Sequence, residues 1–116
     1  MKIAIVGSRN YSDLDHVRGI VKSLSRDTEI VSGGAPGVDK IAEQAAIDRG
    51  MPTKIFPADW EKYGRGAGAI RNKAIVNYAD GVIAFWDGTS RGTKNTIDLA
   101  DKQSKLWGLW EVRDHD

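Results

Sequence analysis

The stretch that decides the fold is MKIAIVGSR, residues 1–9, in which an apolar run of strand length passes directly into a turn of glycine and serine. Residues 3–6 are all apolar, which is typical of a central strand covered on both faces of a parallel sheet. Apolar runs at 29–31 and 82–86 pass into similar turns, SGGAPG at 32–37 and DGTSRGT at 87–93. Strand-length runs that alternate with helical patterns predict βαβ units.

Helical periodicity fills the segments between these runs. The spacing of apolar residues predicts helices at about 17–24, 38–46, 70–78 and 93–103, the first of them capped by Ser12 or Asp13. Strands are predicted at 2–6, 29–31, 54–56, 82–86 and 106–112, with a long connection at 57–68. We therefore predict the α/β fold class, with a Rossmann-like, doubly wound parallel sheet of about five strands in the order 3-2-1-4-5 and helices on both faces.

Length and composition predict one globular domain. The 116 residues fit a domain of ordinary size, which we place at 1–112, followed by a polar C-terminal tail at 113–116. With 41% hydrophobic and 28% charged residues, the composition excludes a disordered or fibrous protein. No apolar stretch reaches the roughly 20 residues of a membrane span, so we expect a cytoplasmic protein without a membrane partner.

Cysteine count and net charge exclude several classes of function. The absence of cysteine rules out a disulfide framework, a thiolate nucleophile and a zinc site built on cysteine. His16 and His115 are far apart in the sequence, so we expect no metal site. A net charge of +1 gives the molecule no overall attraction to nucleic acid, and we therefore do not expect nucleic acid as its main partner.

The three glycine turns follow strands of one parallel sheet, so they are expected at the same edge of it. Helix N-termini at that edge present open N–H groups, and hydroxyls are added by Ser8, Ser32, Thr89, Ser90 and Thr93. Such an edge is expected to bind an anion, most simply a phosphate. The alternative for any single turn is that glycine only supplies a positive φ or close packing. The turns lack the G-x-G-x-x-G and G-x-x-x-x-G-K-[ST] patterns of common nucleotide sites.

Four short motifs, in this order, resemble the SLOG superfamily, above all its small stand-alone members of the YspA type. The motifs are GSR at 7–9, SGGAxGVD at 32–39, Trp60 with AG at 67–68 and RN at 71–72, and GTxxT at 92–96. The resemblance runs from residue 1 to about residue 105. It implies a nucleotide site, because the superfamily includes the Lonely-guy phosphoribohydrolases, the Rossmann-like domain of the DNA-processing protein A, and members thought to sense NAD- and ADP-ribose-derived signals.

The resemblance also implies roles for particular positions. Arg71 precedes Asp80 by nine residues, as the substrate-facing arginine of the Lonely-guy enzymes precedes an aspartate, but Asn72 stands where they have lysine. Thr96 stands where they have glutamate, and a hydroxyl cannot supply the negative charge that stabilises an oxocarbenium-like centre. This departure counts against hydrolase chemistry. The alternative for Arg71 is a solvated surface residue.

Further candidates are two carboxylates and one aromatic residue. We expect Asp39 to be a helix cap or dipole partner, Asp87 to be the best remaining carboxylate, and Trp60 to stack on a base. If the protein is an enzyme, its candidate catalytic residues are Arg71 and Asp87. The full set of expected ligand-binding residues is Gly7, Ser8, Arg9, Ser32, Gly33, Gly34, Ala35, Gly37, Asp39, Trp60, Arg71, Asn72, Asp87, Thr89, Ser90, Arg91, Gly92, Thr93 and Thr96.

The expected function is that of a SLOG-type nucleotide-binding protein that senses or sequesters a nucleotide or an ADP-ribose-like ligand, without a cofactor. One alternative is hydrolysis of the N-glycosidic bond of a nucleotide or NAD derivative, and a second is a single-stranded nucleic-acid-binding domain. We also expect a homodimer, because Trp107 and Trp110 are more than one edge strand easily buries. Residues three apart in a regular strand lie on opposite faces, so one ring is expected on each face of the sheet. The alternative is that each ring packs under a helix of its own subunit.

Overall fold

A parallel five-stranded sheet forms the centre of the structure, a computed structural model in which residues 1–111 are described. The strands are β1 (Lys2–Gly7), β2 (Glu29–Ser32), β3 (Thr53–Ile55), β4 (Gly81–Trp86) and β5 (Leu106–Glu111). Their order is β3-β2-β1-β4-β5, and every neighbouring pair is parallel. The α/β class and the strand order predicted from the sequence are confirmed. Val112 and the tail at 113–116 lie outside the described residues.

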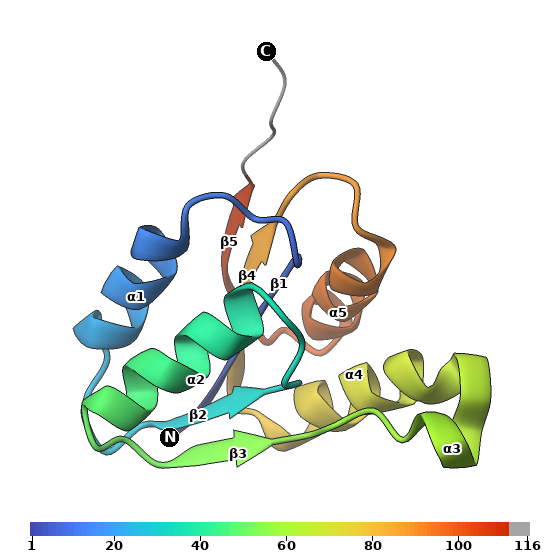
Figure 1. Ribbon diagram of the computed structural model, residues 1–116, viewed down its shortest axis with the longest axis horizontal. Coiled ribbons are helices and arrows are strands. Elements are labelled where there is room, and N and C mark those ends of the chain that lie inside the picture. The colour runs from blue at the N-terminus through green and yellow to red at the C-terminus, as the bar shows by residue number, and fades with distance from the viewer. Residues whose placement is uncertain (112–116) are drawn as a thin grey trace.

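Two pairs of helices cover the two faces of the sheet (Figure 1). On one face lie α1 (Leu14–Ser23) and α2 (Val38–Asp48), and on the other lie α4 (Ala67–Tyr78) and α5 (Arg91–Lys102). The cap of α1 is Asp13, whose carboxylate accepts a hydrogen bond from the N–H of His16 at 3.1 Å. Every helix in the described part of the chain is too short or too polar to cross a membrane.

β1 lies at the middle of the sheet and contributes to both cores. Ile3 and Ile5 join the core under α1 and α2, whereas Ala4 and Val6 join the core under α4 and α5. A strand buried on both sides cannot alternate between apolar and polar residues, which is why this segment is a continuous apolar run. Its carboxyl end passes into Gly7, next to β4, and this places the first glycine turn at the centre of the sheet edge.

The connection at 57–68 is more ordered than the sequence suggested. It contains α3 (Trp60–Tyr63) and a 3-10 turn (Gly64–Gly66), and the carboxylate of Asp59 caps α3 by accepting from the N–H of Lys62. α4 follows directly and begins three residues before the predicted start at 70. As a result Arg71 lies in the second turn of α4, whereas a helix that began at 70, as predicted, would have placed it in the first turn.

β5 contains an irregularity that decides where its two tryptophans lie. Its pairing with β4 shifts register beside Trp107, so this residue is left out of the ladder. The Trp107 ring lies over Gly81, where an added Cβ would be 2.1 Å from it, and the Trp110 ring stacks on Phe85 with centroids 5.5 Å apart. Gly81 and Phe85 are an even number of residues apart in β4, so both rings cover the same face. The expectation of opposite faces was wrong, because the bulge breaks the period of two.

Candidate functional site

A cavity of about 190 Å³ opens at the edge of the sheet where β1 ends. It lies between the turn after β1, the loop after β2, and helices α4 and α5. Its walls are formed by Val6, Gly7, Arg9, Ala35, Asp39, Arg71, Asn72, Ile75, Ser90, Gly92, Thr93 and Thr96. The three glycine turns therefore do lie along one edge, as the parallel sheet required. All three contribute residues to this one cavity.

The turn after β1 is packed tightly against its neighbours. A Cβ added to Gly7 would lie 2.6 Å from Val38 Cγ2 and 2.7 Å from the carbonyl oxygen of Phe85. The N–H of Ser8 donates to that same carbonyl at 3.0 Å. Only glycine fits at position 7, because the backbone of β1 approaches both β4 and the first turn of α2 there.

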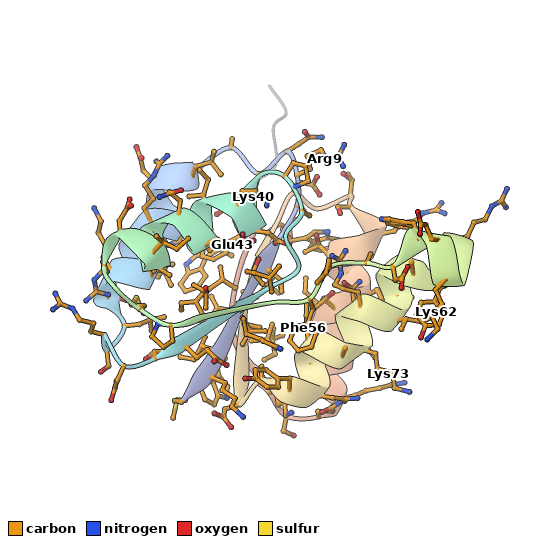
Figure 2. The ribbon with its side chains drawn as sticks, turned by 60° about the horizontal axis from the view of Figure 1, so that its bottom comes forward. Arg9, Lys40, Glu43, Phe56, Lys62 and Lys73 are labelled. Carbon is orange, nitrogen blue, oxygen red and sulfur yellow. The ribbon has the colours of Figure 1, made fainter. Side chains whose placement is uncertain are left out.

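The loop after β2 has its own hydrogen-bond acceptors. The N–H of Gly34 donates to Ser32 Oγ at 3.2 Å, and the N–H of Ala35 donates to Asp39 Oδ2 at 3.2 Å. The Ser32 hydroxyl donates in turn to Glu43 Oε2 at 2.7 Å. Glu43 projects from α2, the helix on which it is labelled in Figure 2. Two N–H groups of the predicted phosphate loop are thus already bonded to side chains of the protein.

Asp39 is the buried carboxylate of this site. It lies in the first turn of α2, its side chain binds back to the preceding loop, and only 6% of the residue is exposed. Burial raises the pKa of Asp39 to about 6, against the lowering effects of the Ala35 N–H and the Arg71 charge. Asp39 also lines the cavity. At neutral pH the cavity therefore has one ionised carboxylate in its wall.

Arg71 is held in place by two hydrogen bonds. Its Nη1 donates to the carbonyl oxygen of Gly33 at 2.7 Å, and its Nε donates to Asn72 Oδ1 at 2.9 Å. Asn72 Nδ2 is itself within 3.3 Å of the Gly92 carbonyl oxygen, so Asn72 links Arg71 to α5. Among residues 1–111 no carboxylate forms an ion pair with Arg71, and its Nη2 has no hydrogen-bond partner there. The guanidinium lies at the cavity wall without a direct ion pair, and its charge acts on the nearby Asp39 carboxylate.

The N-terminus of α5 forms the wall opposite the β2 loop. The N-cap Ser90 makes no capping hydrogen bond with its side chain, so the first N–H groups of α5 have no side-chain acceptor from it. The Thr93 hydroxyl lies 3.3 Å from Ser8 Oγ and 3.2 Å from Ser90 Oγ, which makes a cluster of three hydroxyls. Thr96, 2% exposed, donates to the Gly92 carbonyl oxygen. Open N–H groups, hydroxyls and the positive helix end together suit an anion.

Asp87 is engaged in a local turn. Its Oδ1 accepts from the N–H of Thr89 at 2.9 Å and from the N–H of Ser90 at 2.8 Å. Burial alone would raise the pKa of Asp87, but these N–H donors outweigh it and hold the pKa below its usual value. The carboxylate shapes the turn that leads into α5 and is not part of the cavity wall.

The structure brings ten of the expected ligand-binding residues into the cavity wall. Nine others are outside it, namely Ser8, Ser32, Gly33, Gly34, Gly37, Trp60, Asp87, Thr89 and Arg91. Ser8 lies directly behind the wall, where its hydroxyl is hydrogen-bonded to Thr93, a wall residue. Trp60, in contrast, is 60% exposed on α3. Sequence reasoning missed Val6 and Ile75, which are apolar core residues whose position in a wall leaves no signal in a pattern.

A second hollow, of about 130 Å³, lies beyond Arg71. It is lined mainly by Phe56, Pro57, Tyr63, Ile70 and Ala74, with Asp59 and Arg71 as its charged residues. Figure 2 labels Phe56, which precedes α3 and packs edge-on against Tyr78 of α4. In residues 1–111 no three His, Asp or Glu side chains gather in a way that could hold a metal ion. The two hollows share Arg71 as a common wall.

Two solved structures have the same fold. DNA processing protein A from Helicobacter pylori, described for its single-stranded DNA binding mode, superposes with a TM-score of 0.77 at 24% identity. DprA from Streptococcus pneumoniae superposes with a TM-score of 0.78 at 23% identity. These alignments cover 99% and 98% of this chain, but the chain spans only 66% and 50% of those two proteins. At such identity the likeness shows a common fold.

Sequence comparison is more specific. The gene 61 protein of Mycobacterium phage D29 is 33% identical over 111 residues, an alignment that covers 87% of this chain and 89% of the relative. A family model described as "YspA, cpYpsA-related SLOG family" matches residues 1–63, which hold the first two glycine turns and Asp39. The fold, the cavity between the glycine turns and these matches agree, and the chain belongs to the YspA, cpYpsA-related SLOG family.

Proposed function

We propose that the protein binds a nucleotide or an ADP-ribose-like ligand in the cavity at the end of β1. The observation that carries the proposal is that Arg71, which forms no direct ion pair among residues 1–111, and the N-terminus of α5, which has no side-chain cap from Ser90, line the same small cavity. A guanidinium and helix N–H groups are both donors to phosphate oxygens, and together they bind an anion more strongly than either does alone.

We expect the phosphate at the α5 side of the cavity. Gly92 has no side chain and meets nothing within 4 Å of an added Cβ, so a ligand can approach the backbone there. Thr93 and Ser90 supply hydroxyls at the same wall, and Arg9 adds a second cation from the turn after β1. Figure 2 labels Arg9 on that turn. A phosphate in this position would contact both cations and the helix end.

The size of the cavity limits how much of the ligand it encloses. At about 190 Å³ it is smaller than the roughly 300–1,000 Å³ of pockets that enclose a drug-sized ligand. It suits a phosphate and a sugar, with the base in the open or in the adjoining hollow lined by Phe56, Tyr63 and Ile70. Contacts to the sugar phosphate are shared by many nucleotides, which fits a protein that senses or sequesters a ligand.

A thermal-shift screen tests this proposal. The ligands are AMP, ADP-ribose, cyclic ADP-ribose and NAD, with adenosine as the control that lacks phosphate. A ligand at about 100 times its dissociation constant adds roughly 2.7 kcal/mol to the free energy of unfolding, which is readily seen as a higher melting temperature. We expect a shift with at least one phosphate ligand and none with adenosine. A flat response to all four phosphate ligands would refute nucleotide binding.

The first alternative is hydrolysis of the N-glycosidic bond, and the position of Asp39 favours it. This carboxylate lines the cavity with a pKa of about 6, so it could serve where relatives of the Lonely-guy type have glutamate and this chain has Thr96. Release of free adenine or nicotinamide from AMP or NAD, followed by chromatography, distinguishes the two functions. Asp39→Asn would abolish such release if the carboxylate is catalytic.

The second alternative is binding of single-stranded DNA, favoured by the likeness in fold to DNA processing protein A. Arg9 and Arg71 would contact the phosphates, and Tyr63 or Trp60, both exposed, would stack on bases. Titration of a fluorescent oligonucleotide at two salt concentrations tests this, because phosphate contacts make affinity fall steeply with salt.

We also propose a homodimer formed through β5. This strand is at the free edge of the sheet, with β4 as its one neighbour in the described residues, and its Trp107 and Trp110 are 49% and 38% exposed. Two large rings on one face of an edge strand form the kind of apolar surface that is found at subunit interfaces.

A further inference from the structure

We propose that the site distinguishes phosphates by their charge, and that Asp39 makes it favour a phosphate with one negative charge over a phosphate with two. Singly charged phosphates are those of diesters and of a diphosphate bridge, as in ADP-ribose. The terminal phosphate of a monoester such as AMP carries close to two charges at neutral pH. This inference rests on the proposed nucleotide function and adds the class of phosphate to it.

Asp39 and Arg71 lie side by side at the cavity wall. Both are close to Gly33 of the β2 loop, where an added Cβ would lie 2.7 Å from Arg71 Nη1 and 3.0 Å from Asp39 Oδ2. Among residues 1–111 the two side chains form no direct ion pair, because Arg71 Nη1 donates to the Gly33 carbonyl oxygen, but the charge of Arg71 still acts on the carboxylate. A phosphate that contacts Arg71 in this cavity is therefore also close to Asp39.

This pair of side chains gives little net attraction to a second negative charge. Near both groups the positive charge of Arg71 and the negative charge of Asp39 largely cancel, whereas each further charge on the phosphate has to give up its hydration in the cavity. Arg9 also lines the cavity, but it is an exposed residue, so water and salt screen its charge. The cost of burying a second charge is therefore not compensated by the wall.

The start of α5 is balanced in a similar way. A helix N-terminus carries about half a positive charge, which matches one negative charge better than two. Asp87 adds a negative charge just before the helix, where its Oδ1 accepts from the N–H groups of Thr89 and Ser90, and Ser90 lines the cavity. Both groups proposed to bind the phosphate, Arg71 and the start of α5, thus have a carboxylate beside them. This arrangement limits the negative charge that the site accepts.

The ionisation of Asp39 sets how large the preference can be. The charged groups that face it are Arg71 from α4, Glu43 from its own helix and Arg9 from the turn after β1. Because burial raises the pKa of Asp39 to about 6, the carboxylate is ionised at pH 7.5, where protonating it reduces the affinity about 30-fold. A doubly charged phosphate that Asp39 repels more strongly than this binds with Asp39 protonated. The preference should therefore be at most about 30-fold at pH 7.5 and decrease as the pH falls toward 6.

The test is a pair of calorimetric titrations at pH 7.5 with AMP and with its methyl phosphate ester, which has the same base and sugar but one charge less. A second pair is ADP and ADP-ribose, of which only ADP has a doubly charged phosphate. We expect the parent protein to bind the singly charged member about tenfold more tightly. In Asp39→Asn the ratio should approach one, because the second charge no longer meets a carboxylate. Comparing the ratio between parent and variant separates the charge from any effect of the methyl group.

Asp48→Asn is the matched control. It removes the same charge from the same helix, but Asp48 is exposed at the end of α2 and does not line the cavity, so the ratio should stay that of the parent. Far-UV circular dichroism checks that both variants fold. If the ligands bind but the parent shows no preference, or Asp39→Asn leaves the ratio unchanged, the role of Asp39 is refuted and nucleotide binding stands. If neither pair binds, the charge preference is refuted as well, and the thermal-shift screen decides whether nucleotide binding stands.

Discussion

At the scale of single residues, the site depends on how two charged side chains are held. Arg71 is held by hydrogen bonds to Gly33 and Asn72, and the buried Asp39 accepts a hydrogen bond from Ala35. At neutral pH the charge of Asp39 lowers the stability of the free protein, because burial outweighs the N–H bonds and the Arg71 charge that favour the ionised carboxylate. Residues that oppose stability in this way are concentrated at functional sites.

The first prediction concerns Asp39 and pH. The pKa of its side chain in the folded protein is about 6, compared with 3.8 when unperturbed, so the folded state binds more protons than the unfolded state between these values. The whole shift represents about 3 kcal/mol at roughly 1.4 kcal/mol per pKa unit, and the free energy of unfolding should decrease by about 2 kcal/mol of this as the pH rises from 4 to 6. Asp39→Asn should remove this decrease and be more stable than the parent at pH 7.

Urea unfolding of the two proteins at pH 4.5 and pH 7 measures the difference. Glu43→Gln serves for comparison, because Glu43 is a neighbouring carboxylate on α2 that accepts the Ser32 hydroxyl and does not line the cavity. Parallel stability curves for parent and Asp39→Asn would contradict the prediction.

The second prediction concerns Arg71. Arg71→Ala should weaken binding of the nucleotide found in the thermal-shift screen by roughly 1.5–3 kcal/mol, the range for a hydrogen bond to a charged group. It should also lower the melting temperature slightly, since the bond to the Gly33 carbonyl oxygen is lost. Isothermal titration calorimetry gives the affinity. Arg65→Ala is the control, because Arg65 is exposed and does not line the cavity, and equal affinities for all three proteins would assign Arg71 a structural role only.

At the scale of elements, the site depends on where helices begin. α2 begins directly after Gly37, which has a φ of +88°, and this turn directs Asp39 back toward the β2 loop. α5 begins after Ser90 without a side-chain cap, which leaves its first N–H groups for a ligand. At α2 the carboxylate of Asp39, in the first turn, binds back to the loop, whereas at α5 the carboxylate of Asp87 binds the N–H groups of Thr89 and Ser90 just before the helix.

The third prediction compares two glycines. Gly37→Ala should destabilise the fold by at least 1–3 kcal/mol, because the residue has a positive φ and its Cβ would lie 2.5 Å from the Arg9 carbonyl oxygen. Gly19→Ala, within α1, should stabilise the fold by about 0.5–1 kcal/mol, because its Cβ meets nothing within 4 Å and alanine favours the helix. Chemical denaturation measures both. Similar effects of the two substitutions would show that the turn tolerates a side chain.

At the scale of the whole molecule, β5 presents an unusual edge. The bulge beside Trp107 places this ring and that of Trp110 on the face that carries α1, where His16 is 4.9 Å from the Trp110 ring by centroid distance. Leu109, 44% exposed, pairs with Ala84, a residue of the core on the other face of the sheet. An edge strand with exposed aromatic side chains is open to association, and natural proteins seldom leave such an edge unprotected.

The fourth prediction is that the protein is a homodimer in solution. Light scattering at micromolar concentration should give about twice the chain mass of 12.7 kDa. The double substitution Trp107→Gln with Trp110→Gln should shift the mass to that of one chain. Ile47→Gln, which removes a still more exposed apolar side chain (59%) from α2, should not. A mass near 12.7 kDa for the parent would rule out the dimer.

The sequence by itself determined the class of fold, the order of the strands and the region of the site. Those features follow from local signals, namely continuous apolar runs such as 3–6, glycine turns directly after them, and the rule that the carboxyl ends of parallel strands share an edge. Arg71, which the resemblance to the Lonely-guy enzymes singled out, also lies in the cavity wall.

Only the tertiary structure decided which side chains face the cavity, how deeply they are buried and how their pKa values are shifted. Asp39 could be identified as a residue of the first helical turn, but its burial, its pKa of about 6 and its place in the wall depend on Ala35, Arg71 and Glu43, which come from three segments. The bulge that turned Trp107 onto the face of Trp110 has no signature in the residues around it. Burial and register arise from contacts between distant parts of the chain, so local patterns in the sequence do not carry them.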